Sequence, residues 1–451
     1  MGWVATLVAG LELLMTEAAL FAACGFLVLG VGDLAVDALW IGLRLRGGSG
    51  PLDLKTLPPP ALPGRLAVFV AAWDEAAVIG EMLRAALRTF DHGDYRLYVG
   101  CYPNDPATIA AVGAVADPRI RLVIGTAPGP TTKADCLNRL WEALLEDEML
   151  DGRRVKAVIL HDAEDIVHSA ELRLFDALIE RFDLVQLPVL PLIDRGSRWV
   201  GAHYADEFAE AHGKDLVVRD AIGAGIPSAG VGCAFSREAL ERVAKIAGGL
   251  PFDAESLTED YELGLRIKAG GGTAAFVRMR AGVGLVATRA YFPSTVRAAV
   301  GQKARWIAGI ALAGWDRLGW SGGAAERWMR IRDRQSLVAA LLLLAGYCAL
   351  ALWVVLNVGG VKLRPLPPAL STLVAINMAL LAWRLAMRCG FVTRAYGWRE
   401  GMRAAPRMAV SNAIALLAAW QALSRYRLIR RTGHTNWQKT AHVFPEQVPA
   451  E

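Results

Sequence analysis

The chain has 451 residues, of which 54% are hydrophobic and 21% charged, and its formal net charge is +5. This balance is typical of a globular body that carries several membrane segments, while so small a net charge argues against nucleic-acid binding. The six cysteines form no C-x-x-C pair, which excludes a zinc-finger pattern and a disulfide framework and fits a reducing compartment.

Residues 1–46 are predicted to form an N-terminal membrane segment. The apolar run over residues 18–43 is long enough to span a bilayer, although Asp33 and Asp37 interrupt it. Arg44 and Arg46 follow directly, and by the positive-inside rule they place this end in the cytoplasm. A short span and an interfacial segment remain open for residues 4–15. Residues 47–63 are rich in glycine and proline and are predicted to be a linker.

Residues 64–290 alternate strands with helices, as an α/β domain does. The predicted strands cover residues 66–70, 95–101, 120–124, 155–160 and 184–187, and the predicted helices cover 76–90, 133–149 and 171–182. Repeated β-α units predict a mostly parallel sheet with helices on both faces. Further on, a glycine-spaced turn at 228–232 precedes a short strand, a helix opening at Ser236 and a helix over 261–268.

Three acids, Asp162, Glu164 and Asp165, come directly after the apolar run 155–160. Ligands of open α/β sheets bind at the carboxyl ends of the strands. Asp162 and Glu164 stand at alternate positions, so they can reach the same side of an extended chain and offer hard oxygen ligands to Mg²⁺ or Mn²⁺. Taken alone, the pattern is equally compatible with a solvated turn before the next helix.

Polar residues also follow the first two strands at the same predicted edge. Asp74 and Glu75 follow the first strand, and Asn104 and Asp105 follow the second, where they could hold a base and a ribose. Helix N-caps explain the two aspartates equally well. Lys133 opens a helix, where its ammonium and the backbone N–H groups suit a phosphate, although a surface lysine is the ordinary alternative.

Asp260, in Leu257-Thr258-Glu259-Asp260, lies at a helix start downstream of the glycine-spaced turn. A positioned carboxylate can take the proton of a sugar hydroxyl as the new bond forms, so Asp260 is a candidate general base. The helix N-terminus favours its ionised form. An N-cap is the alternative reading.

Residues 291–330 are predicted to be interfacial helices that carry the motif Gln302-Lys303-Ala304-Arg305-Trp306. Basic residues beside tryptophans are typical of the headgroup layer of a bilayer. Arg305 could hold a diphosphate, and Trp306 could pack against a sugar ring. An interfacial anchor is the alternative, and it accounts for Trp306 but leaves Gln302 unexplained.

Residues 331–390 are predicted to contain two transmembrane helices, over 337–356 and 369–386. Residues 391–451 are predicted to be a cytoplasmic loop, an interfacial helix over 408–423 and a basic tail. Arginines before and after 408–423 place both of its ends in the cytoplasm. They are Arg388, Arg394, Arg399, Arg403, Arg407, Arg425, Arg427, Arg430 and Arg431.

The order D-x-E, T-E-D, Q-x-x-R-W resembles that of membrane-bound family 2 glycosyltransferases with a GT-A fold, such as cellulose and hyaluronan synthases. Residues 102–106, 161–165 and 302–310 resemble more closely the NfrB-like proteins, inner-membrane glycosyltransferases first met as phage-adsorption components. The resemblance covers residues 60–320 strongly and the flanking membrane helices more loosely.

The resemblance implies an α/β, Rossmann-like GT-A domain with flanking transmembrane and interfacial helices, in the bacterial inner membrane with the catalytic domain in the cytoplasm. It implies that Asp162 and Glu164 bind Mg²⁺ or Mn²⁺ and the nucleotide diphosphate, and that Asp260 is the catalytic base. The residues implied to line the nucleotide-sugar pocket are Asp74, Glu75, Asn104, Lys133 and Asp162, and those implied to hold the diphosphate and the acceptor are Gln302, Arg305 and Trp306.

Two departures from the family pattern stand out. The usual D-x-D is D-x-E here, and glutamate is still a hard oxygen ligand. Longer NfrB-like chains carry a further C-terminal domain assigned to cyclic di-GMP binding. The few residues after 437–440 leave no room for one, so regulation in cis is not expected.

These features together predict an inverting, metal-dependent transferase that moves a sugar from a nucleotide-sugar, expected to be a UDP-sugar, to a growing glycan. A processive synthase of a surface or secreted polysaccharide is the favoured form. Its expected partners are the donor, the glycan acceptor, membrane lipid and an outer-membrane export protein. The alternatives are a single-addition transferase acting on a lipid-linked acceptor, and an inactive transferase-like scaffold in an export or phage-receptor assembly.

Overall fold

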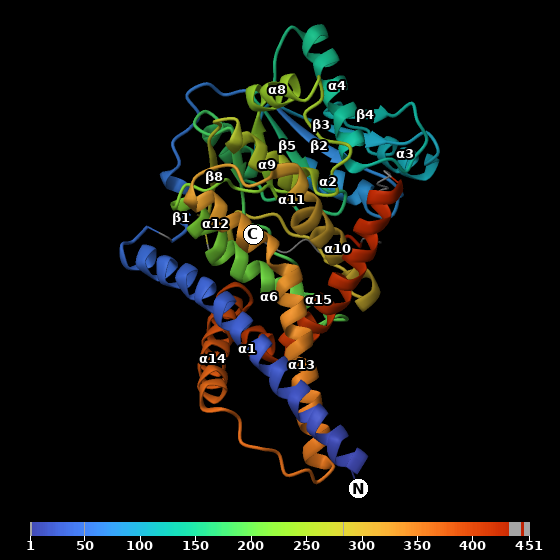
Figure 1. The fold of residues 1–451 in the computed structure, drawn as a ribbon. Helices are drawn as coiled ribbons and strands as arrows, with labels where there is room; N and C mark the ends of the chain where they lie inside the picture. Colours follow the sequence, from blue (N-terminus) through green and yellow to red (C-terminus); the bar gives the residue numbers. More distant parts are fainter. Residues whose placement is uncertain (1, 49, 283, 433–442, 446–451) are drawn as a thin grey trace.

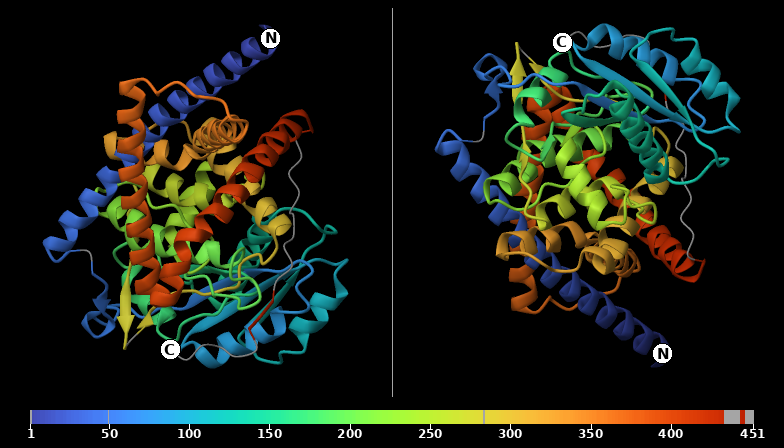
Figure 2. Two further views of the ribbon diagram at one scale, coloured as in Figure 1. Left: turned by 90° about the horizontal axis from the view of Figure 1, so that it is seen from below. Right: turned by 90° about the horizontal axis from the view of Figure 1, so that it is seen from above.

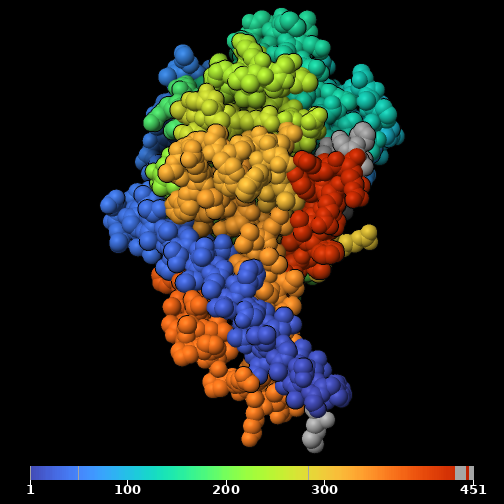
Figure 3. All heavy atoms as spheres, in the orientation of Figure 1, coloured from blue at the N-terminus to red at the C-terminus, as the bar shows by residue number. Residues whose placement is uncertain are grey.

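The structure is a computed structural model that describes residues 2–48, 50–282, 284–432 and 443–445. A globular α/β body lies at the top of Figure 1, and long helices extend below it. The space-filling view shows the blue N-terminal helix and the orange helices forming this extension, clear of the body (Figure 3).

The body is built on a seven-stranded sheet with the order β4-β3-β2-β5-β7-β6-β8. Neighbours from β4 to β5 are parallel, β7 is antiparallel to β5 and β6, and β6 is parallel to β8. The predicted mostly parallel sheet is therefore confirmed, with one reversed strand. The strands are β2 Leu66–Ala71, β3 Tyr95–Cys101, β4 Ile120–Ile124, β5 Ala157–His161, β6 Leu184–Gln186, β7 Cys233–Ser236 and β8 Ala274–Phe276.

Helices cover both faces of the sheet because the central strands are apolar on both sides. Along β2, Leu66, Val68 and Val70 pack with α2 and α5, whereas Ala67 and Phe69 pack with α4 and α8. The helices of the body are α2 Ile79–Thr89, α3 Pro106–Gly113, α4 Lys133–Asp151, α5 Glu171–Leu178, α6 Ala202–Glu210, π-helical η2 Ala211–Asp215, α7 Leu216–Ala221, α8 Arg237–Ile246 and α9 Glu259–Ala269.

The predicted linker is partly ordered as secondary structure. Within it, β1 Leu52–Asp53 pairs in parallel with β9 Met279–Ala281, which in turn pairs with β10 Gly284–Leu285. A 3-10 turn, η1 Leu54–Thr56, follows β1. The edge of β9 offers hydrogen-bond partners to an extended backbone that otherwise has none, and it fixes the path from the membrane to the sheet.

Among the described residues, three helices are long and apolar enough to cross a membrane: α1 Gly2–Leu45, α13 Ser336–Val358 and α14 Pro368–Tyr396. The predicted spans over 18–43, 337–356 and 369–386 all lie within them. Residues 4–15 belong to the same continuous helix α1 rather than to a separate segment. With 44 residues, α1 is about 65 Å long at 1.5 Å per residue, so it extends well beyond a bilayer core of about 30 Å.

The remaining helices lie between the body and the spans. They are α10 Val296–Ile307, π-helical η3 Ala308–Ala313, α11 Gly314–Leu318, α12 Ala324–Arg334 and α15 Trp398–Thr432. Figures 1 and 2 agree that α15 runs beside α10.

The structure differs from the predicted loop after residue 390. Helix α14 continues to Tyr396 and α15 begins at Trp398, so only Gly397, with a φ of 88°, separates them. Two of the arginines that suggested a loop are paired instead with acids of α6. Arg388 Nε donates to Glu210 Oε2 at 3.0 Å, and Arg407 Nη2 to Asp206 Oδ1 at 2.7 Å. The sequence alone does not reveal these partners. Most of the predicted basic tail, including residues 437–440, lies outside the described residues.

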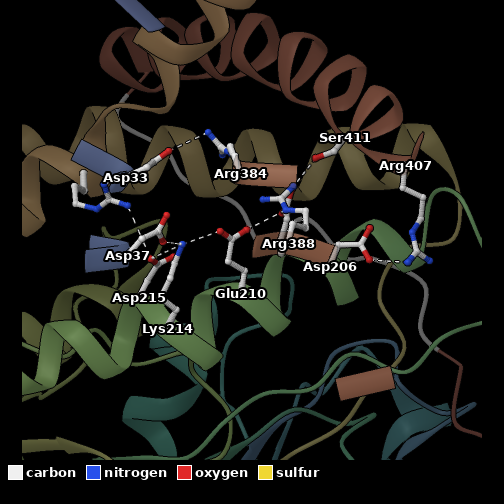
Figure 4. Close-up of polar contacts among 12 residues, drawn as sticks. Asp33, Asp37, Asp206, Glu210, Lys214, Asp215, Arg384, Arg388, Arg407 and Ser411 are labelled. Atoms are coloured by element: carbon white, nitrogen blue, oxygen red, sulfur yellow. Dashed lines mark hydrogen bonds and ion pairs between the residues drawn. The ribbon is translucent and has the colours of Figure 1, made fainter. Parts of the chain in front are cut away.

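Buried ion pairs join the membrane helices to α6 and η2, as Figure 4 shows. Lys214 Nζ donates to Asp37 Oδ1 at 2.7 Å and to Glu210 Oε1 at 2.8 Å. Asp33 pairs with Arg332 at 3.0 Å and with Arg384 at 3.1 Å. The two aspartates that interrupt the first apolar run are therefore compensated by cations of the body and of α14, and they do not face lipid unpaired.

We expect Lys214→Met to lower the thermal unfolding midpoint of the detergent-purified protein by several degrees. It leaves Asp37 and Glu210 buried without their shared cation, and removing one partner of a buried ion pair costs roughly 3–5 kcal/mol. Lys245→Met is the matched control, because the Lys245 side chain is 73% exposed and surface changes stay within about 0.5 kcal/mol. Equal midpoints for the two variants would show that this network does not hold α1 against η2.

Candidate active site

A cavity of about 350 Å³ lies between the carboxyl end of β5, the start of α9 and helix α10. Its volume is within the range of ligand pockets. Three motifs that are far apart in the sequence share it. The predicted site residues that line it are Lys133, Asp162, Glu164, Asp260, Gln302, Arg305 and Trp306.

The turn after β5 is held by a buried histidine between two acids. His161 donates from Nδ1 to Asp165 at 2.9 Å and from Nε2 to Glu171 at 2.7 Å. Burial lowers the pKa of His161, but the charges of Glu171 and Asp165 outweigh it and raise this pKa to about 10. Asp165 also accepts the backbone N–H of Asp162 at 3.0 Å. Asp165 therefore shapes the turn, and Asp162 and Glu164 are the acids whose placement it determines.

Lys133, at the start of α4, places a cation among the acids of the cavity. Its Nζ donates to Asp162 Oδ1 at 2.5 Å. Burial lowers the pKa of Lys133, but the charges of Asp162, Glu259 and Asp260 raise it above its ordinary value. The ammonium is therefore within electrostatic reach of acids from both the β5 turn and α9.

Glu164 is buried in a strongly negative environment. Burial, followed by the charges of Asp162, Asp165 and Glu75, raises the pKa of the Glu164 carboxyl well above its usual range. A divalent cation would relieve this repulsion, and the carboxylate oxygens are the ligand type that Mg²⁺ and Mn²⁺ prefer. Within the described ranges, no group of three or more His, Cys, Asp or Glu residues is placed so that it could hold a metal ion. The protein would thus supply two carboxylates, leaving the other positions to water and phosphate, as is usual for Mg²⁺.

Asp260 lies in the first turn of α9, facing the glycine-spaced turn. Its Oδ1 accepts the backbone N–H of Tyr261 at 2.7 Å. Gly230 has a φ of 73°, and a Cβ on it would lie 2.2 Å from Asp260 Oδ2, so only glycine allows this close approach. Burial raises the pKa of Asp260, and the charge of Lys133 opposes that shift. The glycine spacing was the available signal that residues 228–232 belong to the site.

The Q-x-x-R-W motif contributes one wall of the cavity from α10. Gln302 Oε1 is buried and has no hydrogen-bond partner among the described residues. The ring of Trp306 meets Tyr204 edge-on at 6.0 Å and lies 6.3 Å from Phe208. Lys303 points instead to Glu207, whose Oε2 accepts from its Nζ at 2.7 Å. These aromatic partners are not predictable from the sequence, because nothing in the spacing of Tyr204 and Phe208 marks them.

The other predicted nucleotide residues do not line this cavity. Asn104 Nδ2 donates a hydrogen bond to the carbonyl oxygen of Gly129 at 2.8 Å, and Asn104 Oδ1 accepts one from the backbone N–H of Gly129 at 2.7 Å. Asp105 caps α3 and also accepts the backbone N–H of Asp74 at 2.6 Å, so the N-cap reading of Asp105 is correct. The N-cap position of α2 is Val78 and not Asp74, which has a φ of 54°. Glu75 lies close enough to Glu164 to affect its pKa.

Comparison with known proteins gives relatives and a fold neighbour. Bacteriophage adsorption protein B of Escherichia coli (strain K12) is 37% identical over 413 residues, covering 84% of this chain and 55% of the relative. Bacteriophage N4 adsorption protein B of Escherichia coli O157:H7 matches with the same identity and coverage. The chain therefore spans about half the length of the curated relatives that it matches. These matches confirm the predicted resemblance to NfrB-like proteins.

A solved structure confirms the predicted GT-A fold. The mannosyltransferase PcManGT from Pyrobaculum calidifontis, in complex with GDP-Man and Mn²⁺, superposes with a TM-score of 0.54. The alignment covers 92% of this chain and 99% of that chain at 17% sequence identity. At this identity, the likeness bears on the fold alone.

The sequence model described as "Glycosyltransferase like family 2" matches residues 63–309, which is more than half of the chain. The matched segment contains the sheet, the β5 turn, Asp260 and the Q-x-x-R-W motif. The predicted enzyme class is thereby confirmed, and the chain belongs to glycosyltransferase family 2.

Proposed function

We propose that this protein is an inverting glycosyltransferase of the bacterial inner membrane that transfers a sugar from a UDP-sugar to a growing glycan, with its catalytic domain in the cytoplasm. The observation that carries the proposal is the meeting of Asp162, Glu164, Asp260 and the Q-x-x-R-W motif in one cavity. The three apolar helices beside the body support a membrane location. Arg44 and Arg46 at the end of α1 support the orientation.

In this proposal, Asp162 and Glu164 hold Mg²⁺ or Mn²⁺. Once bound, the ion would neutralise the charge that develops on the leaving diphosphate. Lys133 and Arg305 bind the diphosphate oxygens from the two sides of the cavity. Glu75, Asp74 and Asn104 lie outside the lining of the cavity, at the ends of the neighbouring strands, and are proposed to contact the nucleotide beyond it, with Asn104 acting through the Gly129 loop that it holds.

Asp260 is the proposed general base. It removes the proton of the acceptor hydroxyl while that oxygen attacks the anomeric carbon on the face opposite the diphosphate. Its raised pKa strengthens it as a proton acceptor. Trp306, backed by Tyr204 and Phe208, offers an aromatic surface to a sugar ring, and Gln302 Oε1 offers a buried hydrogen-bond acceptor. The acceptor would therefore enter from the α10 side.

The names of the relatives favour a product at the cell surface. A phage adsorbs to the outside of the cell, so a polymer exported through an outer-membrane partner would connect an inner-membrane transferase to adsorption. We therefore favour a processive synthase. A single-addition transferase acting on a lipid-linked acceptor remains the second candidate, favoured by the cavity described in the next section. An inactive scaffold is disfavoured, because candidate acids fill every position expected of the family.

A donor screen tests this proposal. We expect the purified full chain with Mn²⁺ to release UDP from one or a few members of a UDP-sugar panel, and chromatographic sizing to show a product longer than one added sugar. A product with a single addition would favour the second candidate. If no member of the panel is bound or turned over, the UDP-sugar donor is excluded, and failure to bind any nucleotide with Mg²⁺ or Mn²⁺ would favour the inactive scaffold.

A further inference from the structure

A second, larger cavity of about 1210 Å³ lies between α10 and the C-terminal half of α15. We call it the α10–α15 groove. Gln302 and Arg305 line both this groove and the active-site cavity. The side chains of α15 that line it are Leu417, Trp420, Gln421, Ser424 and Arg425. A ligand in the groove would therefore touch the same two side chains as the substrates of the active site.

Three arginines line the groove, and no acid is among its described lining residues. Arg297, Arg305 and Arg425 line it, and none of them pairs with a carboxylate within 4.0 Å in the described part of the chain. Nη1 of Arg425 is buried and lacks a hydrogen-bond partner there. Burial, and then the charge of Arg305, lower the pKa of Arg425. The N-terminus of the 12-residue helix α10 adds partial positive charge. These groups favour an anion, and phosphate suits guanidinium groups well.

Apolar side chains also line the groove, which reaches toward the membrane helices. Val296 and Val300 line the α10 side, and Leu417 and Trp420, which are 53% and 75% exposed, line the α15 side. Five residues before Leu417, Asn412 Nδ2 donates to Tyr347 Oη of the span α13 at 3.0 Å. Five residues of helix rise about 7.5 Å, so the apolar end of the groove lies near a span. A free anion needs no such wall, whereas a lipid chain does.

We propose that the α10–α15 groove binds a lipid phosphate that carries the acceptor sugar. Its phosphate would lie between Arg297, Arg425 and the N-terminus of α10, and its hydrocarbon chain along Leu417 and Trp420. This inference rests on the proposed function in the form of its second candidate, a transferase that acts on a lipid-linked acceptor. The acceptor sugar then extends past Gln302 toward Asp260. Its hydroxyl oxygen forms a bond to the anomeric carbon of the donor as the bond from that carbon to the diphosphate breaks. UDP leaves, and the hydroxyl proton passes to Asp260.

The test uses farnesyl phosphate as the probe on the full chain in detergent, without nucleotide. We expect wild-type protein to bind farnesyl phosphate at least about tenfold more tightly than farnesol or inorganic phosphate. Arg425→Gln and Trp420→Ala should each weaken binding by at least about tenfold. Arg427→Gln, an exposed arginine of the same helix outside the groove, should stay within about twofold. Farnesyl phosphate should also inhibit sugar transfer by the wild type and spare Arg425→Gln at the same concentration.

Three results would overturn the inference: equal affinity in Arg425→Gln and wild type, inorganic phosphate binding as tightly as farnesyl phosphate, or full displacement of the probe by phosphatidylglycerol vesicles at equal lipid concentration. UDP binding in the presence of Mn²⁺, measured on the same variants, separates this failure from that of the proposed function. If UDP binds normally and the lipid phosphate does not, only the groove assignment falls. If the lipid phosphate binds but UDP never does, the acceptor role is overturned together with the proposed function.

Discussion

Asp260→Asn is expected to lower the rate of sugar transfer by roughly 10²–10⁴-fold, which is the contribution typical of a general base. The affinity for the UDP-sugar should stay within a few-fold of wild type. The amide has nearly the size of the carboxylate, so it fits beneath Gly230 without strain, yet it cannot accept the hydroxyl proton. Single-turnover transfer with saturating donor measures the chemical step, and equilibrium UDP binding measures the affinity.

The matched control for this variant is Glu255→Gln. Glu255 lies five residues before Asp260 in the same connection, and its side chain is 89% exposed, so this change also removes one negative charge but away from the cavity. We expect its transfer rate to equal that of wild type. Near-normal transfer by Asp260→Asn would remove Asp260 from the role of base and would direct attention to the neighbouring Glu259.

Asp162→Asn and Glu164→Gln are expected to weaken Mn²⁺-dependent UDP binding by at least about 100-fold each. Losing an outer-shell partner of a metal ligand typically costs 10–100-fold, and these side chains are proposed to contact the ion itself. The same loss should appear in wild-type protein treated with EDTA and should be reversed by added Mn²⁺. Calorimetry with UDP, with and without the ion, measures both effects.

Glu238→Gln serves as the control for the acid variants, since Glu238 is an exposed acid at the start of α8 and lies outside the cavity. Its UDP affinity should not change. UDP binding of equal strength with and without EDTA would contradict the assignment of a metal site, even if the acid variants were inactive.

Local sequence patterns predicted the α/β part of the fold well. The predicted strand over residues 155–160 corresponds to the central strand β5, Ala157–His161, and Lys133 opens α4 as predicted. The order of the acids and of Q-x-x-R-W also predicted residues that meet in the cavity. Asp162 and Glu164 lie there because they follow β5 at the carboxyl edge of the sheet, whereas helices α9 and α10 carry Asp260 and Q-x-x-R-W. The wall contributed by Tyr204 and Phe208 was missed, since it depends on how α6 packs against α10.

Long-range charge pairing was the information that the sequence lacked. Asp37 and Lys214 are 177 residues apart, and no periodicity links them. For the same reason, the arginines around Arg407 resembled a solvated loop, although Arg407 is buried against Asp206 and belongs to a continuous helix. Asn104 was likewise placed at the correct strand end, but its side chain is engaged by the Gly129 backbone.

The most direct test of the whole account is an experimentally determined structure of the full chain with UDP and Mn²⁺. We predict one Mn²⁺ ion, located by its anomalous scattering, in contact with carboxylate oxygens of both Asp162 and Glu164 and with the diphosphate of UDP, and with Asp260 facing the same cavity. A nucleotide bound elsewhere, or bound here with no ion beside these two carboxylates, would contradict the account.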